Sequence, residues 1–267
     1  MDGSVTNLKQ MFGPEKPIIG MVHIWAPSPS YRHTWNRQTL KEVFSQIEWD
    51  IKALQEGGVD GLLFVNESDK PSRDRVSQDV YAWLSLIIGG VFKTIKIPFG
   101  IEVLSDKIAG IQLGSMYGAS FVRGNFFDRS TTKDFEDEKR NFEWSQTSNE
   151  LESAKLAIFG NYSLRNNEGF FTQEGNKLTE SGILNHISGI LISEKELLAS
   201  LEYYFEYKSK NPKKELIVSN GVHIGNAKKV FDLADGIIVG SDFKEDAVIT
   251  NKVDPRRVFQ LVSEARR

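Results

Sequence analysis

The chain contains no cysteine, and this absence removes several kinds of chemistry at once. Disulfides, thiolate metal sites and a cysteine nucleophile are excluded, and the composition is compatible with a reducing compartment. The first apolar run, Pro17 to His23, is far shorter than the roughly 20 residues that span a bilayer. It also lacks the basic flank and the cleavage site of a signal peptide. We therefore expect an uncleaved cytoplasmic protein without membrane insertion.

An excess of charge of one sign is also missing. The 33 basic and 36 acidic residues leave a net charge of −3, so electrostatics give no reason to expect a nucleic-acid partner. Asn66, Glu67 and Asp69 could supply oxygen ligands, but paired histidines and a DxD-type spacing are lacking. We predict no metal and no cofactor, and a transient Mg²⁺ stays open. The oligomeric state is not fixed by the sequence, so a homo-oligomer stays open too.

The alternation of apolar runs predicts the fold. Eight short runs alternate with longer segments of helical period, as in βα units around a parallel sheet. The runs cover residues 17–23, 61–66, 97–104, 120–125, 155–159, 189–193, 215–220 and 236–240. A flavodoxin-like open sheet normally needs only about five strands. We therefore predict a (β/α)₈ TIM barrel formed as a single domain by residues 1–267, a length usual for this fold.

Two helix boundaries are clear. Apolar residues recur every three or four positions after the first run, at Leu40, Val43, Phe44, Ile47, Ile51 and Leu54. Gly57 and Gly58 should end that helix. The last helix should begin at Asp254 and Pro255, a good N-cap and a good first-turn residue. Between residues 126 and 186 polar residues dominate, and we expect long or irregular loops there.

The last two strand-to-helix turns predict a phosphate site. Phosphate is often held there in a (β/α)₈ barrel, so the fold is expected to be of the phosphate-binding type. Gly221 and Gly240 would let backbone N–H groups approach an anion, while Asn226 would cap a helix over residues 227–233 and Ser241 would add a hydroxyl. The predicted phosphate-binding residues are Asn220, Gly221, Asn226, Gly240 and Ser241. The alternative, that these glycines only make tight turns, stays open.

Polar residues at the other strand ends predict a ring around the barrel mouth. The predicted catalytic residues are Glu102 and His23, and the predicted substrate-binding residues are Asn66, Glu67, Arg123, Asn125 and Asn161. Glu102 stands among apolar strand residues, which suits either a general base whose pKa is raised by burial or an ion pair with Arg123. His23 would relay protons, bind a metal as a neutral imidazole, or line the mouth as a hydrogen-bonding residue, and His223 is expected to be a loop residue.

The connection after His23 is long and aromatic. Residues 25–35 include Trp25, Tyr31, His33 and Trp35, and exceed an ordinary βα turn. We expect a mobile cover over the site in which Arg32 closes onto an anion, or else an aromatic plug.

With these residues in place, the sequence resembles the BtpA family almost end to end. The matching pieces, in order, are residues 16–23, 57–61, 66–67, 97–104, 118–123, 220–222, 234–240, 243–244 and 253–254. The resemblance implies a phosphate-binding TIM barrel of unsettled substrate, with one branch tied to photosystem I biogenesis. The family usually has asparagine where Glu102 stands, and residues 105–107, 160–163 and 193–196 replace the family's usual turns.

Two functions follow. The first is an enzyme that acts on a phosphorylated small molecule, such as a sugar phosphate, as an isomerase or lyase using acid-base chemistry. The second is a catalytically degenerate barrel that keeps phosphate binding and acts as a sensor or assembly factor. The altered turns at 160–163 and 193–196 favour the second.

Overall fold

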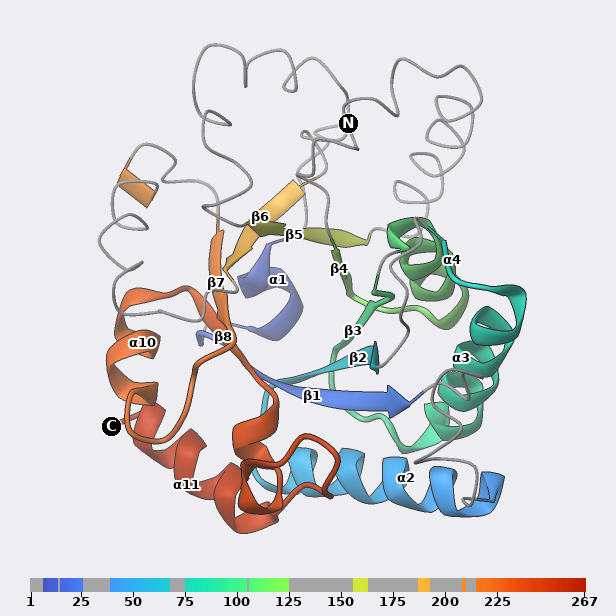
Figure 1. Cartoon of the computed structure of the whole chain (residues 1–267). Coiled ribbons are helices and arrows are strands. Elements are labelled where there is room, and N and C mark those ends of the chain that lie inside the picture. The colour runs from blue at the N-terminus through green and yellow to red at the C-terminus, as the bar shows by residue number, and fades with distance from the viewer. Residues whose placement is uncertain are drawn as a thin grey trace.

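The chain folds into a closed parallel barrel with helices around it (Figure 1). The computed structural model describes residues 7–13, 15–25, 39–67, 75–104, 106–124, 156–162, 187–192, 208–209 and 215–267. The strands pair in chain order, and β8 returns to β1. They are β1 (Ile18–Trp25), β2 (Gly61–Glu67), β3 (Phe99–Glu102), β4 (Phe121–Gly124), β5 (Ala157–Tyr162), β6 (Ile187–Ile192), β7 (Glu215–Ser219) and β8 (Gly236–Val239). The predicted (β/α)₈ fold is confirmed.

The helices of the described residues mostly begin at a side chain that caps their first turn. They are α1 (Leu8–Phe12), α2 (Leu40–Glu56), α3 (Gln78–Val91), α4 (Lys107–Tyr117), α10 (Ala227–Leu233) and α11 (Pro255–Ala265), with short 3₁₀ turns η2 (Phe92–Thr94), η3 (Ser241–Phe243) and η4 (Glu245–Ala247). Thr39 and Glu42 bond reciprocally at the start of α2, and Gly57 ends that helix. Asp254 caps α11 by accepting from the Arg256 N–H. Both predicted boundaries are confirmed.

Strand side chains alternate between two hydrophobic layers, as the pleat of a strand requires. The barrel interior contains Ile19, Leu63, Phe121, Phe159, Ile217 and Ile238. The layer between strands and helices contains their neighbours of opposite parity, including Ile18, Leu62, Phe64, Ile101, Val122, Val218 and Val239. This alternation decides which polar side chains at the strand ends enter the barrel mouth.

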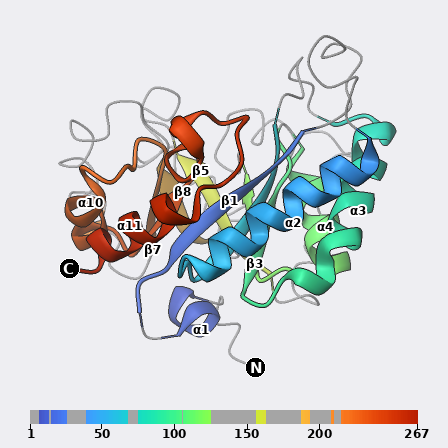
Figure 2. The same ribbon diagram turned by 90° about the horizontal axis from the view of Figure 1, so that it is seen from below.

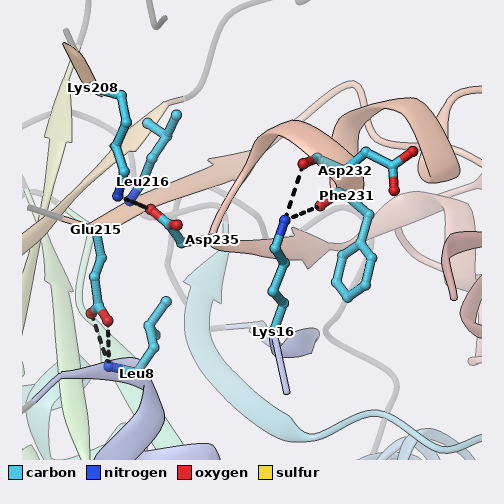
Figure 3. Close-up of polar contacts among 8 residues, drawn as sticks. All are labelled: Leu8, Lys16, Lys208, Glu215, Leu216, Phe231, Asp232 and Asp235. Carbon is cyan, nitrogen blue, oxygen red and sulfur yellow. Dashed lines mark hydrogen bonds and ion pairs between the residues drawn. The ribbon is translucent and has the colours of Figure 1, made fainter. Parts of the chain in front are cut away.

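Helix α1 covers the end of the barrel where the strands begin (Figure 2). The Leu8 N–H donates to both oxygens of Glu215, at 2.9 and 2.8 Å, and burial raises the pKa of that carboxyl. The Phe12 ring meets the Phe121 ring edge-on, with 6.1 Å between centroids. Figure 3 shows Glu215 beside a second contact, in which Lys208 pairs with Asp235. A ligand therefore has to approach from the opposite end of the barrel.

At the same end of the barrel, Lys16 joins the segment before β1 to α10. Lys16 donates to the backbone oxygens of Phe231 and Asp232, at 3.0 and 3.1 Å, in the last turn of that helix (Figure 3). A cation there satisfies carbonyl groups that lack intrahelical partners and complements the helix dipole. The segment that leads into β1 is thereby fixed against α10.

β1 and β5 run at least two residues beyond their predicted carboxyl ends. β1 continues past His23 to Trp25, because His23 to Trp25 pair with Val65 to Glu67 of β2. β5 continues past residue 159 to Tyr162, where it pairs with β6. β3, predicted over 97–104, is shorter. His23 and Asn161 thus lie within strands, which fixes their backbones. The predicted cover lies outside the described residues apart from Trp25, whose carbonyl accepts from Trp83 Nε1 at 3.0 Å.

A buried ion pair joins α2 to the chain that follows β8. Lys244 Nζ lies 2.5 Å from Asp50 Oδ2, and both side chains are about 2% exposed. Asp50 Oδ1 accepts from the Val253 N–H at 2.8 Å. No sequence pattern predicted this contact, because its partners are 194 residues apart. It ties the 3₁₀ turns after β8 to the helix layer.

We predict that Lys244→Met lowers the free energy of unfolding by about 3 to 5 kcal/mol, because Asp50 would keep a buried charge without its partner. The matched control is Lys228→Met, which removes an exposed pair with Asp232 on α10 and should cost less than about 0.5 kcal/mol. Urea denaturation measures both. Equal losses in the two variants would contradict a structural role for the buried pair.

Candidate functional site

The barrel mouth has a polar floor made by alternate strands. In an eight-stranded barrel the inward side chains of every second strand lie at one level, because the strands are staggered by about eight residues in all. The observed register places one residue each from β1, β3, β5 and β7 in such a layer. These are Met21, Glu102, Asn161 and Ser219. Met21 and Asn161 are partly exposed, so they form the accessible part of this floor.

One side of the floor is an ion pair held by an amide. Arg123 Nε lies 3.2 Å from Glu102 Oε2, and both side chains are more than nine-tenths buried. Asn161 donates from Nδ2 to Glu102 Oε1 at 3.1 Å and accepts from Arg123 Nε at 2.8 Å. Of the two alternatives for Glu102, the structure contains the ion pair with Arg123. The sequence placed these three residues in one ring, and the structure brings them into direct contact.

His23 is a neutral imidazole at the edge of this floor. It is 4% exposed, and burial, assisted by the positive charge of Lys244, lowers its pKa to about 3. Nδ1 has no hydrogen-bond partner among the described residues. Nε2 lies 3.9 Å from Glu67 Oε1, which is too far for a hydrogen bond. At neutral pH this imidazole suits hydrogen bonding to a ligand better than carrying a positive charge.

Asn66 does not join the mouth. It has the parity of Leu62 and Phe64, so it faces the helix layer, and it is fully buried. Its Oδ1 accepts from the Leu104 N–H at 2.6 Å, just beyond Glu102. The predicted substrate contact is therefore replaced by a structural one, in which Asn66 fixes the turn that follows β3. The sequence placed it at a strand end without resolving its side of the sheet.

The two turns predicted to bind phosphate are joined to each other. Asp242, after β8, accepts from the Ile224 N–H at 3.2 Å and pairs with Arg257 at 2.8 Å. Asn220 and Gly221 both have positive φ, 68° and 67°, which asparagine and glycine tolerate best. The turn after β7 therefore lies beside the turn after β8.

Asn226 corrects one expectation. It precedes α10, but its side chain makes no capping bond to that helix. It closes the turn instead, donating to the Gly221 carbonyl at 2.7 Å and accepting from the His223 N–H at 2.9 Å. Because Gly225 and Ala227 also donate to His223, these backbone groups are already engaged. The predicted anion site keeps Asn220, Gly221, Gly240 and Ser241, whereas the Asn226 side chain is used within the turn.

Gly240 borders the floor directly. A Cβ at this position would lie 3.0 Å from Met21 Sδ and 3.5 Å from His23 Nε2. Any larger residue would therefore press on the mouth side chains. Asn125 lies outside the described residues. Among the residues that are described, no three His, Asp or Glu side chains lie close enough to hold a metal ion, and no helix is long and apolar enough to cross a membrane.

Sequence reasoning missed four residues near the site. Ser219 and Met21 face inward in β7 and β1, and strand alternation from the predicted turn glycines could have found them. Asp242 and Lys244 follow β8 and make their contacts with α11 and α2. Those contacts depend on tertiary packing, so no local pattern predicted them.

This fold and mouth define a TIM barrel with a polar, charge-paired floor. The chain belongs to the BtpA family, which it matches over residues 14–267. Among its relatives, the sgc region protein SgcQ of Escherichia coli is 27% identical, with 96% of this chain and 97% of SgcQ covered. The photosystem I biogenesis protein BtpA of Synechocystis is 28% identical, with 96% and 90% covered. The predicted family is confirmed.

Solved structures share the fold at low sequence identity. A dihydropteroate synthase of Xanthomonas albilineans has a TM-score of 0.58 and 10% identity, covering 94% of this chain and 91% of its own. A tryptophan synthase of Mycobacterium tuberculosis has a TM-score of 0.56 and 13% identity, covering 95% and 94%. At such identities the likeness shows the fold alone.

We predict that His23 makes the protein sensitive to mild acid. The folded protein keeps the imidazole neutral to about pH 3, whereas the unfolded chain takes up a proton near pH 6.5. Stability from this group is therefore full above pH 6.5 and falls by roughly 1 kcal/mol per pH unit below it. His23→Gln should lose this dependence in urea denaturation between pH 7.5 and 5. An equal change in the control His223→Gln, at an exposed loop histidine, would contradict the assignment.

Proposed function

We propose that the chain is an enzyme that acts on a small phosphorylated metabolite, such as a sugar phosphate, by acid-base chemistry in the barrel mouth. The observation that carries this proposal is the Glu102–Arg123–Asn161 cluster at the end of β3, β4 and β5. A buried ion pair and the amide bonded to it, at the end of a TIM barrel where active sites lie, often stabilise a fold less than apolar residues of the same size would. A functional demand explains their presence.

The mouth offers two different walls. Glu102 and Arg123 form one wall with no net charge, whereas Gly221, Gly240 and Ser241 lie in the turns that follow β7 and β8. Glycine lets backbone N–H groups come within hydrogen-bonding distance of phosphate oxygens. We infer that the phosphate lies at the β7–β8 wall, with the reacting carbon atoms toward Glu102.

The roles follow from the charges. Glu102 is the carboxylate that can take a proton from carbon, and Arg123 and Asn161 hold it in place. His23 is neutral, so it can donate a hydrogen bond to a carbonyl oxygen on which negative charge develops. This arrangement suits proton abstraction from the carbon next to a carbonyl, the first step of an isomerisation. The same base acting on a hydroxyl β to the carbonyl would begin a carbon-carbon bond cleavage, with the electron pair of the broken bond passing to the carbonyl oxygen.

A second function is supported by a specific observation. Both oxygens of Glu102 are engaged, and His23 carries no positive charge at neutral pH, so it is a weak general acid. A barrel with these properties could bind a phosphorylated ligand without turning it over and act as a sensor or assembly factor. Its relative in Synechocystis is named for photosystem I biogenesis, which is a role of that kind.

We predict that inorganic phosphate raises the thermal unfolding midpoint of the parent protein and that Gly240→Val abolishes this shift. The valine side chain would occupy the space beside Met21 and His23. Gly110→Val is the control, because a Cβ there has its nearest neighbours at 3.6 Å and lies on α4. Each shift is measured against the same variant without phosphate. A full shift in Gly240→Val would place the anion elsewhere.

Turnover separates the two functions. Pentose and hexose phosphates that stabilise the protein are incubated with it and followed by NMR. For an enzyme, Glu102→Gln should keep ligand stabilisation but lower turnover by about 10²- to 10⁴-fold, because the amide cannot accept the proton. Glu215→Gln, the same change at the opposite end of the barrel, should keep turnover. Stabilisation without any turnover by the parent would favour the binding function.

A further inference from the structure

Ser219 has an unsatisfied hydroxyl inside the barrel. Its side chain is fully buried at the end of β7, and Oγ has no hydrogen-bond partner among the described residues. Ser219 shares the parity of Ile217, an interior residue, so the hydroxyl points toward the barrel axis. A buried polar group without a partner destabilises the free protein. Such a group in the floor of a site calls for a partner that the described residues do not supply.

A second unsatisfied atom lies two strands away. β7, β8 and β1 are consecutive around the sheet, and they contribute Ser219, Gly240 and His23 to one wall. His23 Nδ1 is also buried without a partner in the described part of the chain. Gly240 follows the strand between them, and a Cβ there would meet Met21 Sδ at 3.0 Å and His23 Cε1 and Nε2 at 3.5 Å. The opposite wall differs, because Glu102, Arg123 and Asn161 bond to one another.

We propose that Ser219 binds a hydroxyl group of the ligand, so that the preferred ligand is a phosphate ester with a hydroxylated carbon chain. This inference rests on the phosphate binding proposed above. A hydroxyl both donates and accepts. It can therefore bond to the serine hydroxyl and to His23 Nδ1, whether that nitrogen is the donor or the acceptor of the neutral ring. A second anionic group would gain little from the opposite wall, because Arg123 there is already paired with Glu102. Ser219 is thus a binding residue that selects for ligand hydroxyls.

Met21 is the side chain that has to move. It lies in the same layer as Ser219, is partly exposed, and has Sδ against Gly240. Methionine is unbranched and has three rotatable bonds, so changing its rotamer disturbs the barrel less than moving a branched side chain would. Rotation of Met21 would open Ser219 to the mouth when a ligand arrives.

The test compares two esters of equal chain length, ribitol 5-phosphate and pentyl phosphate, by isothermal titration calorimetry. The parent should bind ribitol 5-phosphate more tightly. Ser219→Ala should weaken that affinity about three- to tenfold, the effect of one neutral hydrogen bond, and leave pentyl phosphate unchanged. Without ligand, Ser219→Ala should unfold at the same temperature as the parent or higher, because it removes an unsatisfied group. A structural serine would not give this combination.

Ser188→Ala is the matched control. Ser188 Oγ is also buried without a partner among described residues, but it has the parity of Ile190 and faces the helix layer. It should not change the affinity for either ester. Equal affinity of the parent and Ser219→Ala for ribitol 5-phosphate, or a preference of the parent for pentyl phosphate, would overturn this inference alone. Failure of inorganic phosphate and both esters to bind the parent would overturn the proposed function and this inference together.

Discussion

The closure of the parallel sheet is the constraint on which the site depends. Once eight strands close with a fixed stagger, the pleat decides which side chains meet in the interior. Glu102 and Asn161 are 59 residues apart on strands that are not neighbours, yet they share a hydrogen bond, because alternate strands contribute to one layer. A shift of β4 by one residue would turn Arg123 into the apolar helix layer without Glu102. The cost of that unpaired charge helps to enforce the register.

Ion pairs fix the chain after β8 to the surrounding helices. Asp50 and Lys244 join the chain after β8 to α2, and Asp242 joins the two last turns through Ile224 and Arg257. Each pair fixes a segment that has little regular structure of its own. Lys244 also acts on the site at a distance, because its charge contributes to the neutrality of His23. Lys244 therefore both holds this segment in place and helps to keep His23 neutral.

Strands and turns could be predicted because their signals are local. Short apolar runs located each strand to within a few residues, and adjacency alone was enough to suggest the Glu102–Arg123 pair. Side-of-sheet assignments were harder, since Asn66 was placed in the mouth although parity turns it outward. Asn226 had the sequence of a cap, but the Gly221 carbonyl and the His223 N–H competed successfully for its side chain. The role of Ser219 depends on what surrounds it in space, which one sequence does not give.

The two walls of the mouth differ in how completely they are satisfied. On β3, β4 and β5 each polar side chain of the cluster is bonded within it, so this wall is organised before any ligand arrives. On β7, β8 and β1, within the described chain, Ser219 Oγ and His23 Nδ1 lack partners, and Gly240 follows the strand between them. Leaving two buried groups unsatisfied lowers stability, and proteins tolerate such losses where binding requires them. Under the proposed function, the satisfied wall would align the reacting group and the unsatisfied wall would capture the ligand.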